Sequence, residues 1–164
     1  MESLDLTIQP PRSPYQKLVG LYMMPRTIDK MRAQLSGGKT GAYTITTPFV
    51  PGLSILLLES IGVTEDHLRQ RIQEASTEDE IADWLQRNAD LSRLADINER
   101  LRSQRVEDVL GLIPAGAFYQ FYPAAVNMRP TSPMFDVLLE DDRRLPPPSG
   151  VAARGRSGRV PPSR

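Results

Sequence analysis

The spacing of apolar residues along the chain predicts a protein built mainly from short helices. The first predicted helix begins at Ser13 and Pro14, because serine caps free backbone N–H groups and proline fits the first helical turn. Four apolar residues then follow at the i, i+3, i+4 and i+7 spacing of one helix face: Tyr15, Leu18, Val19 and Tyr22. We expect Pro25 to end or kink this helix.

The helical spacing resumes beyond this point. Four apolar residues define one face of a second helix: Met24, Ile28, Met31 and Leu35. We expect this helix to end at Gly37 and Gly38, since glycine readily takes the backbone conformation that follows a helix. Pro51 then opens the most apolar segment of the chain, residues 53–58, which we predict to be the central buried helix, ended by Gly62.

Capping residues indicate where the next helices start. Thr64 precedes a helix with an inner stripe that includes Leu68 and Ile72. Thr77 and Glu80 form a capping box before a fifth helix. A sixth helix starts at Asp90 or Ser92, and its apolar face consists of Leu94, Ile97 and Leu101. One more helical turn is expected before Pro114.

Three segments lack the helical spacing. Residues 1–12 end in a proline pair and are expected to form an extended arm. Residues 39–49 are rich in β-branched side chains and predict at most one short strand, hairpin or extended insert. Residues 115–134 contain three prolines and are expected to be irregular. Four aromatic residues gather there, either as core packing or as a lid over a ligand pocket: Phe118, Tyr119, Phe121 and Tyr122.

The predicted fold class is therefore mainly α: a compact, bundle-like single domain of about six short helices over residues 1–142. Residues 143–164 consist largely of Pro, Gly, Ser and Arg, and we expect a disordered tail. This tail has six arginines and no acidic residue, whereas residues 1–142 have 14 basic and 20 acidic residues, a net charge of −6. The overall net charge of zero thus conceals an acidic body and a basic tail.

Composition removes several classes of chemistry. The chain has no cysteine and a single histidine, His67, so no motif implies a cofactor or a metal site, and His67 is expected to lie exposed in a first helical turn. The first five residues carry acids where a secretion signal needs positive charge, and the longest aliphatic run, residues 55–58, is far too short to span a bilayer. We therefore expect a soluble, cytoplasmic protein that does not bind membranes.

Several stretches resemble a known family. They are Asp5-Leu6-Thr7, Pro10-Pro11-Arg12-Ser13-Pro14, Pro25-Arg26 with Asp29-Lys30 and Arg32-Ala33, and Phe135-Asp136-Val137-Leu138-Leu139 with Asp141-Asp142. The sequence resembles a bacterial family of small helical proteins catalogued only as a domain of unknown function, most clearly over residues 4–35. The resemblance implies a small helical fold, and it implies no catalytic or binding residue.

The second predicted helix carries the best candidate site. Asp29 is three residues from both Arg26 and Arg32, with Lys30 beside it, so two guanidinium groups can reach one carboxylate. The structural interpretation is a solvated row of ion pairs, and the functional one is an anion site, because arginine binds carboxylate or phosphate through two hydrogen bonds. Our leading hypothesis is a non-enzymatic binding or interaction module that recognises a protein partner or a small anion through these residues.

Two other functions stay open at this point. One is a small enzyme with carboxylate and tyrosine chemistry, using Asp29 with Tyr43 or an acidic turn, provided that the carboxylates converge. The acidic turn comprises Asp136, Glu140, Asp141 and Asp142. The other is weak contact with nucleic acid through the arginines of residues 143–164, since phosphate neutralisation needs no sequence-specific motif.

Overall fold

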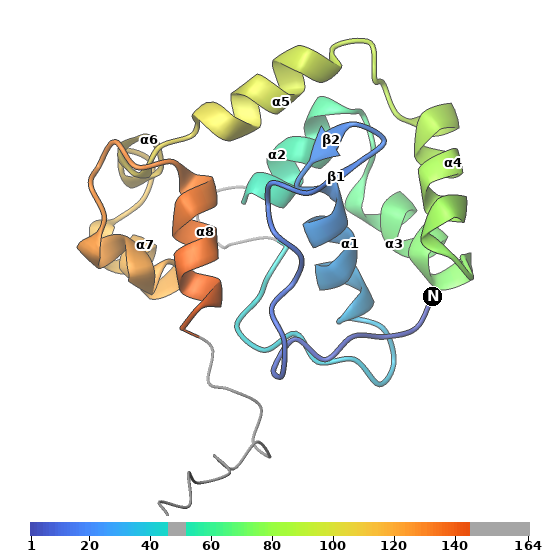
Figure 1. Cartoon of the computed structure of the whole chain (residues 1–164), viewed down its shortest axis with the longest axis horizontal. Helices are drawn as coiled ribbons and strands as arrows, with labels where there is room; N and C mark the ends of the chain where they lie inside the picture. Colours follow the sequence, from blue (N-terminus) through green and yellow to red (C-terminus); the bar gives the residue numbers. More distant parts are fainter. Residues whose placement is uncertain (46–51, 145–164) are drawn as a thin grey trace, which may run out of the picture.

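The computed structural model describes residues 1–45 and 52–144 and confirms the mainly helical fold class (Figure 1). These residues form a two-stranded hairpin and more helices than the six expected: β1 (Lys17–Leu18), β2 (Leu21–Tyr22), α1 (Met24–Arg32), α2 (Leu53–Ser60), α3 (Glu65–Glu74), α4 (Glu78–Asn88), α5 (Leu94–Ser103), α6 (Val106–Leu110), α7 (Ala115–Phe121), the 3-10 helix η1 (Pro123–Asn127) and α8 (Met134–Asp142). Most of the predicted basic tail and part of the predicted extended insert lie outside the described residues.

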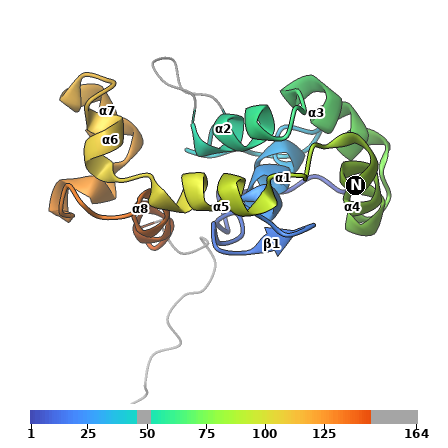
Figure 2. The same cartoon turned by 90° about the horizontal axis from the view of Figure 1, so that it is seen from above.

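Two hydrophobic clusters hold the described residues together. The larger one gathers side chains from α1 to α5 together with Leu21 of β2 and Phe135 and Leu138 of α8, and a smaller one is built from residues 106–137. Helix α5 runs from the α4 side of the molecule to the α6 side, in both views of the ribbon (Figures 1 and 2). Leu53 and Tyr122 contact both clusters, so the boundary between them passes beside these two side chains.

Helix α1 is the most buried helix, which differs from the expectation for residues 53–58. Seven of its nine residues are buried, including the charged Arg26 and Asp29. In α2, by contrast, only Ser54, Leu57 and Leu58 are fully buried. The apolar composition of α2 therefore predicted more burial than the structure shows. Helix α1 is buried although it carries charged side chains, because these pair with other parts of the chain.

The helix predicted from Ser13 to Tyr22 is wrong, because this segment folds as the β1–β2 hairpin. Lys17 pairs with Tyr22 and Leu18 with Leu21, and the two turn residues have φ angles of 46° at Val19 and 82° at Gly20. Two positive φ angles give the turn type that matches the twist of paired strands. Asn98 of α5 fixes the hairpin, since it accepts a hydrogen bond from the Tyr22 amide at 3.0 Å and donates one to the Gly20 carbonyl at 2.8 Å.

Pro25 lies in the first turn of α1, so it starts a helix where we expected it to end or kink one. That helix ends at Arg32, before the expected glycines. The only further strand pairing described near the predicted insert is a single bridge between Asp5 and Lys39. The N-terminal arm packs on its own domain through this bridge and through the buried Leu6.

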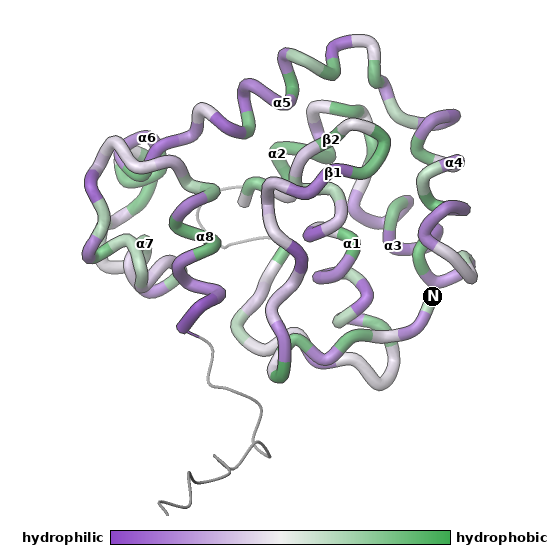
Figure 3. Tube along the Cα trace, in the orientation of Figure 1, coloured by the Kyte–Doolittle hydropathy of each residue, from purple (hydrophilic) through white to green (hydrophobic). Residues whose placement is uncertain are grey.

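Helices α3 and α4 confirm the prediction from caps and spacing. Helix α5 confirms the spacing alone, because it begins at Leu94 after Arg93 and not at the predicted Asp90 or Ser92. The Thr64 and Thr77 hydroxyls accept hydrogen bonds from the amides of His67 and Glu80. Only half of the predicted capping box forms, because the Glu80 carboxylate accepts from the Ser76 amide and not from Thr77. Hydrophobic and hydrophilic residues alternate along these helices (Figure 3), as expected for helices with one buried face. No helix among the described residues is long and apolar enough to cross a bilayer.

The expectation of an irregular segment over residues 115–134 is corrected, because α7 and η1 lie within it. Phe118 is fully buried in the smaller cluster, with its ring centroid 5.3 Å from that of Tyr119 and 5.2 Å from that of Tyr122. A helix with a glycine and several aromatic residues has weak intrinsic propensity. Tertiary packing of Phe118 therefore stabilises α7.

Candidate binding pocket between α1 and α8

Arg26 of α1 is 1% exposed and forms a two-point ion pair with Asp142 of α8. Its Nη1 and Nη2 donate to the two Asp142 carboxylate oxygens at 2.8 and 2.9 Å. The Tyr43 hydroxyl donates to the same carboxylate at 3.0 Å, and the Arg26 guanidinium lies 5.5 Å from the Tyr43 ring centroid. Arg26 Nε has no hydrogen-bond partner among the described residues.

Asp29 faces a different arginine. Arg12, from the N-terminal arm, donates to Asp29 from its Nε, its Nη2 and its backbone amide, each at 2.9 Å. The same guanidinium also donates to Glu78 of α4 from Nη1 at 2.8 Å. This arrangement connects the arm, α1 and α4 through one arginine, and it leaves Asp29 4% exposed and fully engaged.

The other two candidate residues, Arg32 and Lys30, contact different parts of the chain. Arg32 donates to the Glu2 carbonyl at 2.8 Å and lies 3.9 Å from Asp29. Lys30 donates from Nζ to the Thr44 carbonyl at 2.9 Å and is half-buried. The four predicted residues therefore do not share one exposed surface. Arg26 and Lys30 reach the side of α1 near α8, whereas Asp29 and Arg32 reach the N-terminal arm. Arg26 also touches this arm, since its Nη1 donates to the Arg12 carbonyl at 3.2 Å.

A cavity of about 280 Å³ lies on the side that Arg26 and Lys30 share. It is bounded by α1, by residues 42–45, by the start of α2, and by the segments around η1 and α8. Among the described residues its lining is mostly apolar or aromatic, with a few charged side chains: Met23, Arg26, Lys30, Ala42, Tyr43, Thr44, Ile45, Gly52, Leu53, Gln120, Phe121, Tyr122, Pro123, Leu138, Asp141 and Arg144. The cavity thus lies where the two hydrophobic clusters meet.

Several ionisable groups around this cavity have shifted pKa values. Burial, reinforced by the positive charge of Arg26, lowers the pKa of Lys30 to about 7, and Asp142 opposes this shift. Burial also raises the pKa of Asp141, although that carboxylate accepts a hydrogen bond from the Ala124 amide at 2.7 Å. The pKa values of Tyr43 and Tyr122 are raised, in both cases mainly by burial. Burial and the neighbouring Arg26 charge thus favour the neutral form of the Lys30 amine.

The acidic turn does not converge on one point. Asp136 accepts from the Tyr15 hydroxyl at 2.8 Å, Asp142 holds Arg26, and Glu140 pairs with Arg143 on the surface. Tyr43 contacts Asp142 and not Asp29, contrary to the pairing considered for an enzyme. Residues 1–45 and 52–144 contain no group of three or more His, Cys, Asp or Glu side chains placed to hold a metal ion.

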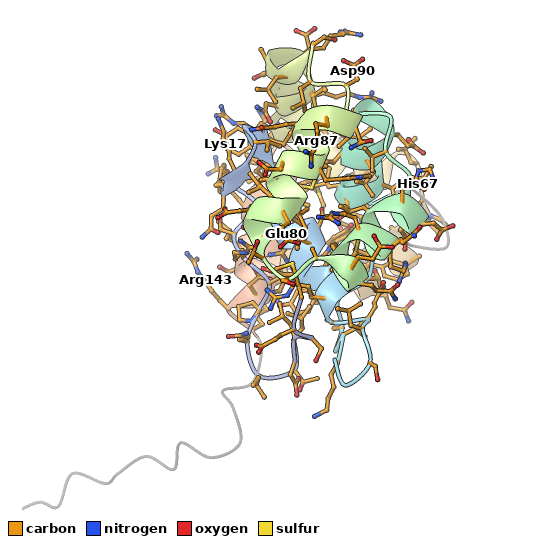
Figure 4. All side chains as sticks on the ribbon, turned by 90° about the vertical axis from the view of Figure 1, so that its right-hand side faces the viewer. Lys17, His67, Glu80, Arg87, Asp90 and Arg143 are labelled. Carbon is orange, nitrogen blue, oxygen red and sulfur yellow. The ribbon has the colours of Figure 1, made fainter. Side chains whose placement is uncertain are left out.

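Part of the aromatic cluster lines the cavity, whereas His67 does not. Phe118 belongs to the core, whereas Phe121 and Tyr122 line the cavity, so each expectation for the cluster holds for part of it. His67 lies exposed on α3, as expected, on the opposite side of the view from Lys17 (Figure 4). It is not among the described residues that line the cavity.

The sequence did not reveal several residues of the pocket. Leu138 and Arg144 come from segments that join α1 only in the folded chain, and Asp142 was considered as a member of an acidic turn and not as the partner of Arg26. A buried arginine needs a carboxylate partner, but the burial of Arg26 has no local signal in α1, where four of the nine residues are charged. The sequence does not say which of the 20 acidic residues provides it.

The fold and the pocket define a small helical protein with a mainly apolar cavity at the junction of two hydrophobic clusters. Residues 8–110 match the family described as "Domain of unknown function (DUF5069)", and the chain belongs to this family. The matched residues end at Leu110, the last residue of α6, so one wall of the cavity lies in the match and the other, from α7 to α8, lies beyond it. No match was found among curated proteins.

Proposed function

We propose that the protein is a binding module for a small organic anion, and that the cavity between α1 and α8 is its site. The observation that carries this proposal is the composition of the cavity: a mostly apolar wall with a few charged groups, in a volume of about 280 Å³. Small-molecule sites have this character, since apolar surface provides affinity and a few polar groups fix the orientation. The cytoplasmic location expected from the sequence remains part of the proposal.

The charges of the lining favour an anionic ligand. Lys30, Arg26 and Arg144 contribute basic groups and Asp141 a single carboxyl, whose raised pKa reduces its negative charge. Arg26 is already neutralised by Asp142, but its Nε still lacks an acceptor among the described residues. A carboxylate bound near Lys30 favours the ammonium form, so binding is expected to take up protons near pH 7.

The apolar part of the lining favours a ligand with an aromatic or branched body. Tyr43, Tyr122 and Phe121 border the cavity together with aliphatic side chains such as Leu53 and Leu138. Aromatic rings stack favourably on one another and on hydrocarbon groups. We therefore expect compact aromatic carboxylates to bind better than inorganic phosphate or sulfate.

The test is a screen of small carboxylates, including 4-methylbenzoate, by ligand-observed NMR, followed by calorimetry in buffers of different ionisation enthalpy. Leu53→Trp fills the cavity and is expected to weaken binding at least tenfold. Leu112→Trp is the matched control, because Leu112 is 70% exposed and lies outside the cavity lining. Thermal unfolding verifies that both variants fold. The absence of any ligand, or equal affinity in the filled and control variants, would refute the proposal.

A further inference from the structure

Lys30 differs from the other lysines of the chain in its surroundings. The sequence has three lysines, and Lys30 is the one that lines the cavity. Lys17 lies on the surface with its ammonium 4.2 Å from the Tyr22 ring centroid. Lys39 is 65% exposed and pairs with Asp5 at 2.9 Å. The chain therefore contains one cavity lysine and two surface lysines for comparison.

The surroundings of the Lys30 amine favour its neutral form. Arg26 lies one helical turn earlier on the same helix and carries a permanent positive charge. Among the described residues, the other ionisable groups that line the cavity are Tyr43 before α2, Tyr122 after α7, and Asp141 and Arg144 at the end of α8, with Asp142 paired to Arg26. A lysine in an apolar pocket beside a second cation is the arrangement that produces a nucleophilic amine.

We propose that Lys30 condenses reversibly with the carbonyl group of an aldehyde or ketone held in the cavity, forming an imine. This inference rests on the proposed function, because the cavity must first admit an organic ligand. It goes further by assigning the ligand a carbonyl group and Lys30 a covalent role.

The step balances without an oxidant or reductant. The neutral amine attacks the carbonyl carbon, a C–N bond forms, and the C=O electron pair moves to oxygen, which gains the proton that nitrogen loses. The C–O bond then breaks, the oxygen leaves as water after a second protonation, and the nitrogen lone pair forms the C=N bond of a protonated imine. Loss of the remaining N–H proton to the carboxylate that supplied the second proton gives the imine. Asp141 lines the same cavity and has a raised pKa, so its carboxyl is suited to deliver the second proton.

The full chain is incubated with 4-carboxybenzaldehyde and sodium cyanoborohydride, which reduces imines in preference to aldehydes at pH 7, and modified residues are located by peptide mass spectrometry. The expected product is a secondary amine on Lys30, with a mass increase equal to the aldehyde less one oxygen atom. We expect modification at Lys30 to exceed that at Lys17 and Lys39 at least tenfold at pH 7. Lys30→Arg removes this product while keeping a positive charge, and Asp141→Asn slows its formation.

Binding of 4-methylbenzoate, which has no reactive carbonyl, separates the two proposals. If this probe binds in the cavity but the aldehyde labels the three lysines equally, the covalent role of Lys30 is refuted and the binding function stands. If neither probe occupies the cavity, both proposals fail. A Lys30→Arg variant whose total labelling equals that of wild type would also overturn the assignment, provided that its thermal unfolding is unchanged.

Discussion

Arg26 and Asp142 form an ion pair that joins residues 116 positions apart in the chain. The two side chains are 1% and 9% exposed and meet through two parallel hydrogen bonds. Arg26 lies inside the segment that matches the family, whereas Asp142 lies in α8, beyond it. This contact therefore ties α8, the last helix of the described residues, to α1 beside the cavity that both helices line.

The first prediction concerns this pair. Asp142→Asn keeps the shape of the side chain but leaves the buried Arg26 charge unpaired, so we expect a loss of about 3–5 kcal/mol in the free energy of unfolding. Glu140→Gln breaks only a surface pair with Arg143 and is expected to cost less than about 1 kcal/mol. Urea unfolding measures both. An equal loss of unfolding free energy in the two variants would show that the buried pair stabilises the protein no more than the surface pair does.

The second prediction concerns Arg12, which contacts both Asp29 and Glu78. A lysine at position 12 keeps the charge but cannot make the two parallel hydrogen bonds, so Arg12→Lys should destabilise the protein by about 1–2 kcal/mol in thermal or chemical unfolding. Arg93→Lys, in an exposed pair with Asp96, is the control and should be nearly neutral. If Arg12→Lys left the free energy of unfolding unchanged, the positive charge at position 12 would be sufficient for stability without the parallel hydrogen bonds.

Local signals along the chain explain which parts of the fold were predictable. Thr64 and Thr77 begin α3 and α4 because their hydroxyls bond to amides three residues later, an interaction that depends only on neighbouring residues. The inner face of α5 likewise follows from spacing, since Ile97 and Leu101 are buried as expected. These elements need no information from distant parts of the chain.

The errors arose where distant contacts decide the structure. The apolar residues from Tyr15 to Tyr22 fit a helix by spacing, but Gly20 adopts a positive φ angle and Asn98 of α5 holds the resulting hairpin. The candidate site shows the same limitation. Sequence reasoning selected Arg26 and Lys30, which do line the cavity, but the partner that neutralises Arg26 comes from α8 and has no local signature.

The third prediction tests the hairpin turn. Gly20 has a φ angle of 82°, and a Cβ atom there would come within 2.7 Å of the Leu94 side chain. Gly20→Ala should therefore destabilise the protein by about 1–2 kcal/mol. Gly116→Ala is the matched control: the site lies within α7 and has open space, so alanine should stabilise by about 0.5–1 kcal/mol. Chemical unfolding is expected to show a lower free energy of unfolding for Gly20→Ala and a higher one for Gly116→Ala. A change in the same direction in both variants would contradict the turn geometry.

The fourth prediction concerns the pH dependence of stability. The folded protein lowers the pKa of Lys30 from 10.5 to about 7. Between these values the unfolded chain binds more protons than the folded one, so the free energy of unfolding contributed by Lys30 rises with pH. One full proton corresponds to about 1.4 kcal/mol per pH unit, and the half-buried amine should give part of that between pH 7 and 9. Above pH 10 the raised pKa of Tyr43 acts in the opposite direction.

Lys30→Met removes this titration, so we expect a smaller increase in stability from pH 7 to 9 than in wild type, measured by urea unfolding at several pH values. The methionine also removes the cost of holding a charge in the cavity, and the variant should gain most over wild type at pH 7. Lys39→Met changes an exposed lysine beside Asp5 and should keep the wild-type slope. A Lys30→Met slope equal to that of wild type would mean that the Lys30 amine is protonated to the same extent in the folded and unfolded chains, and that the cavity does not favour its neutral form.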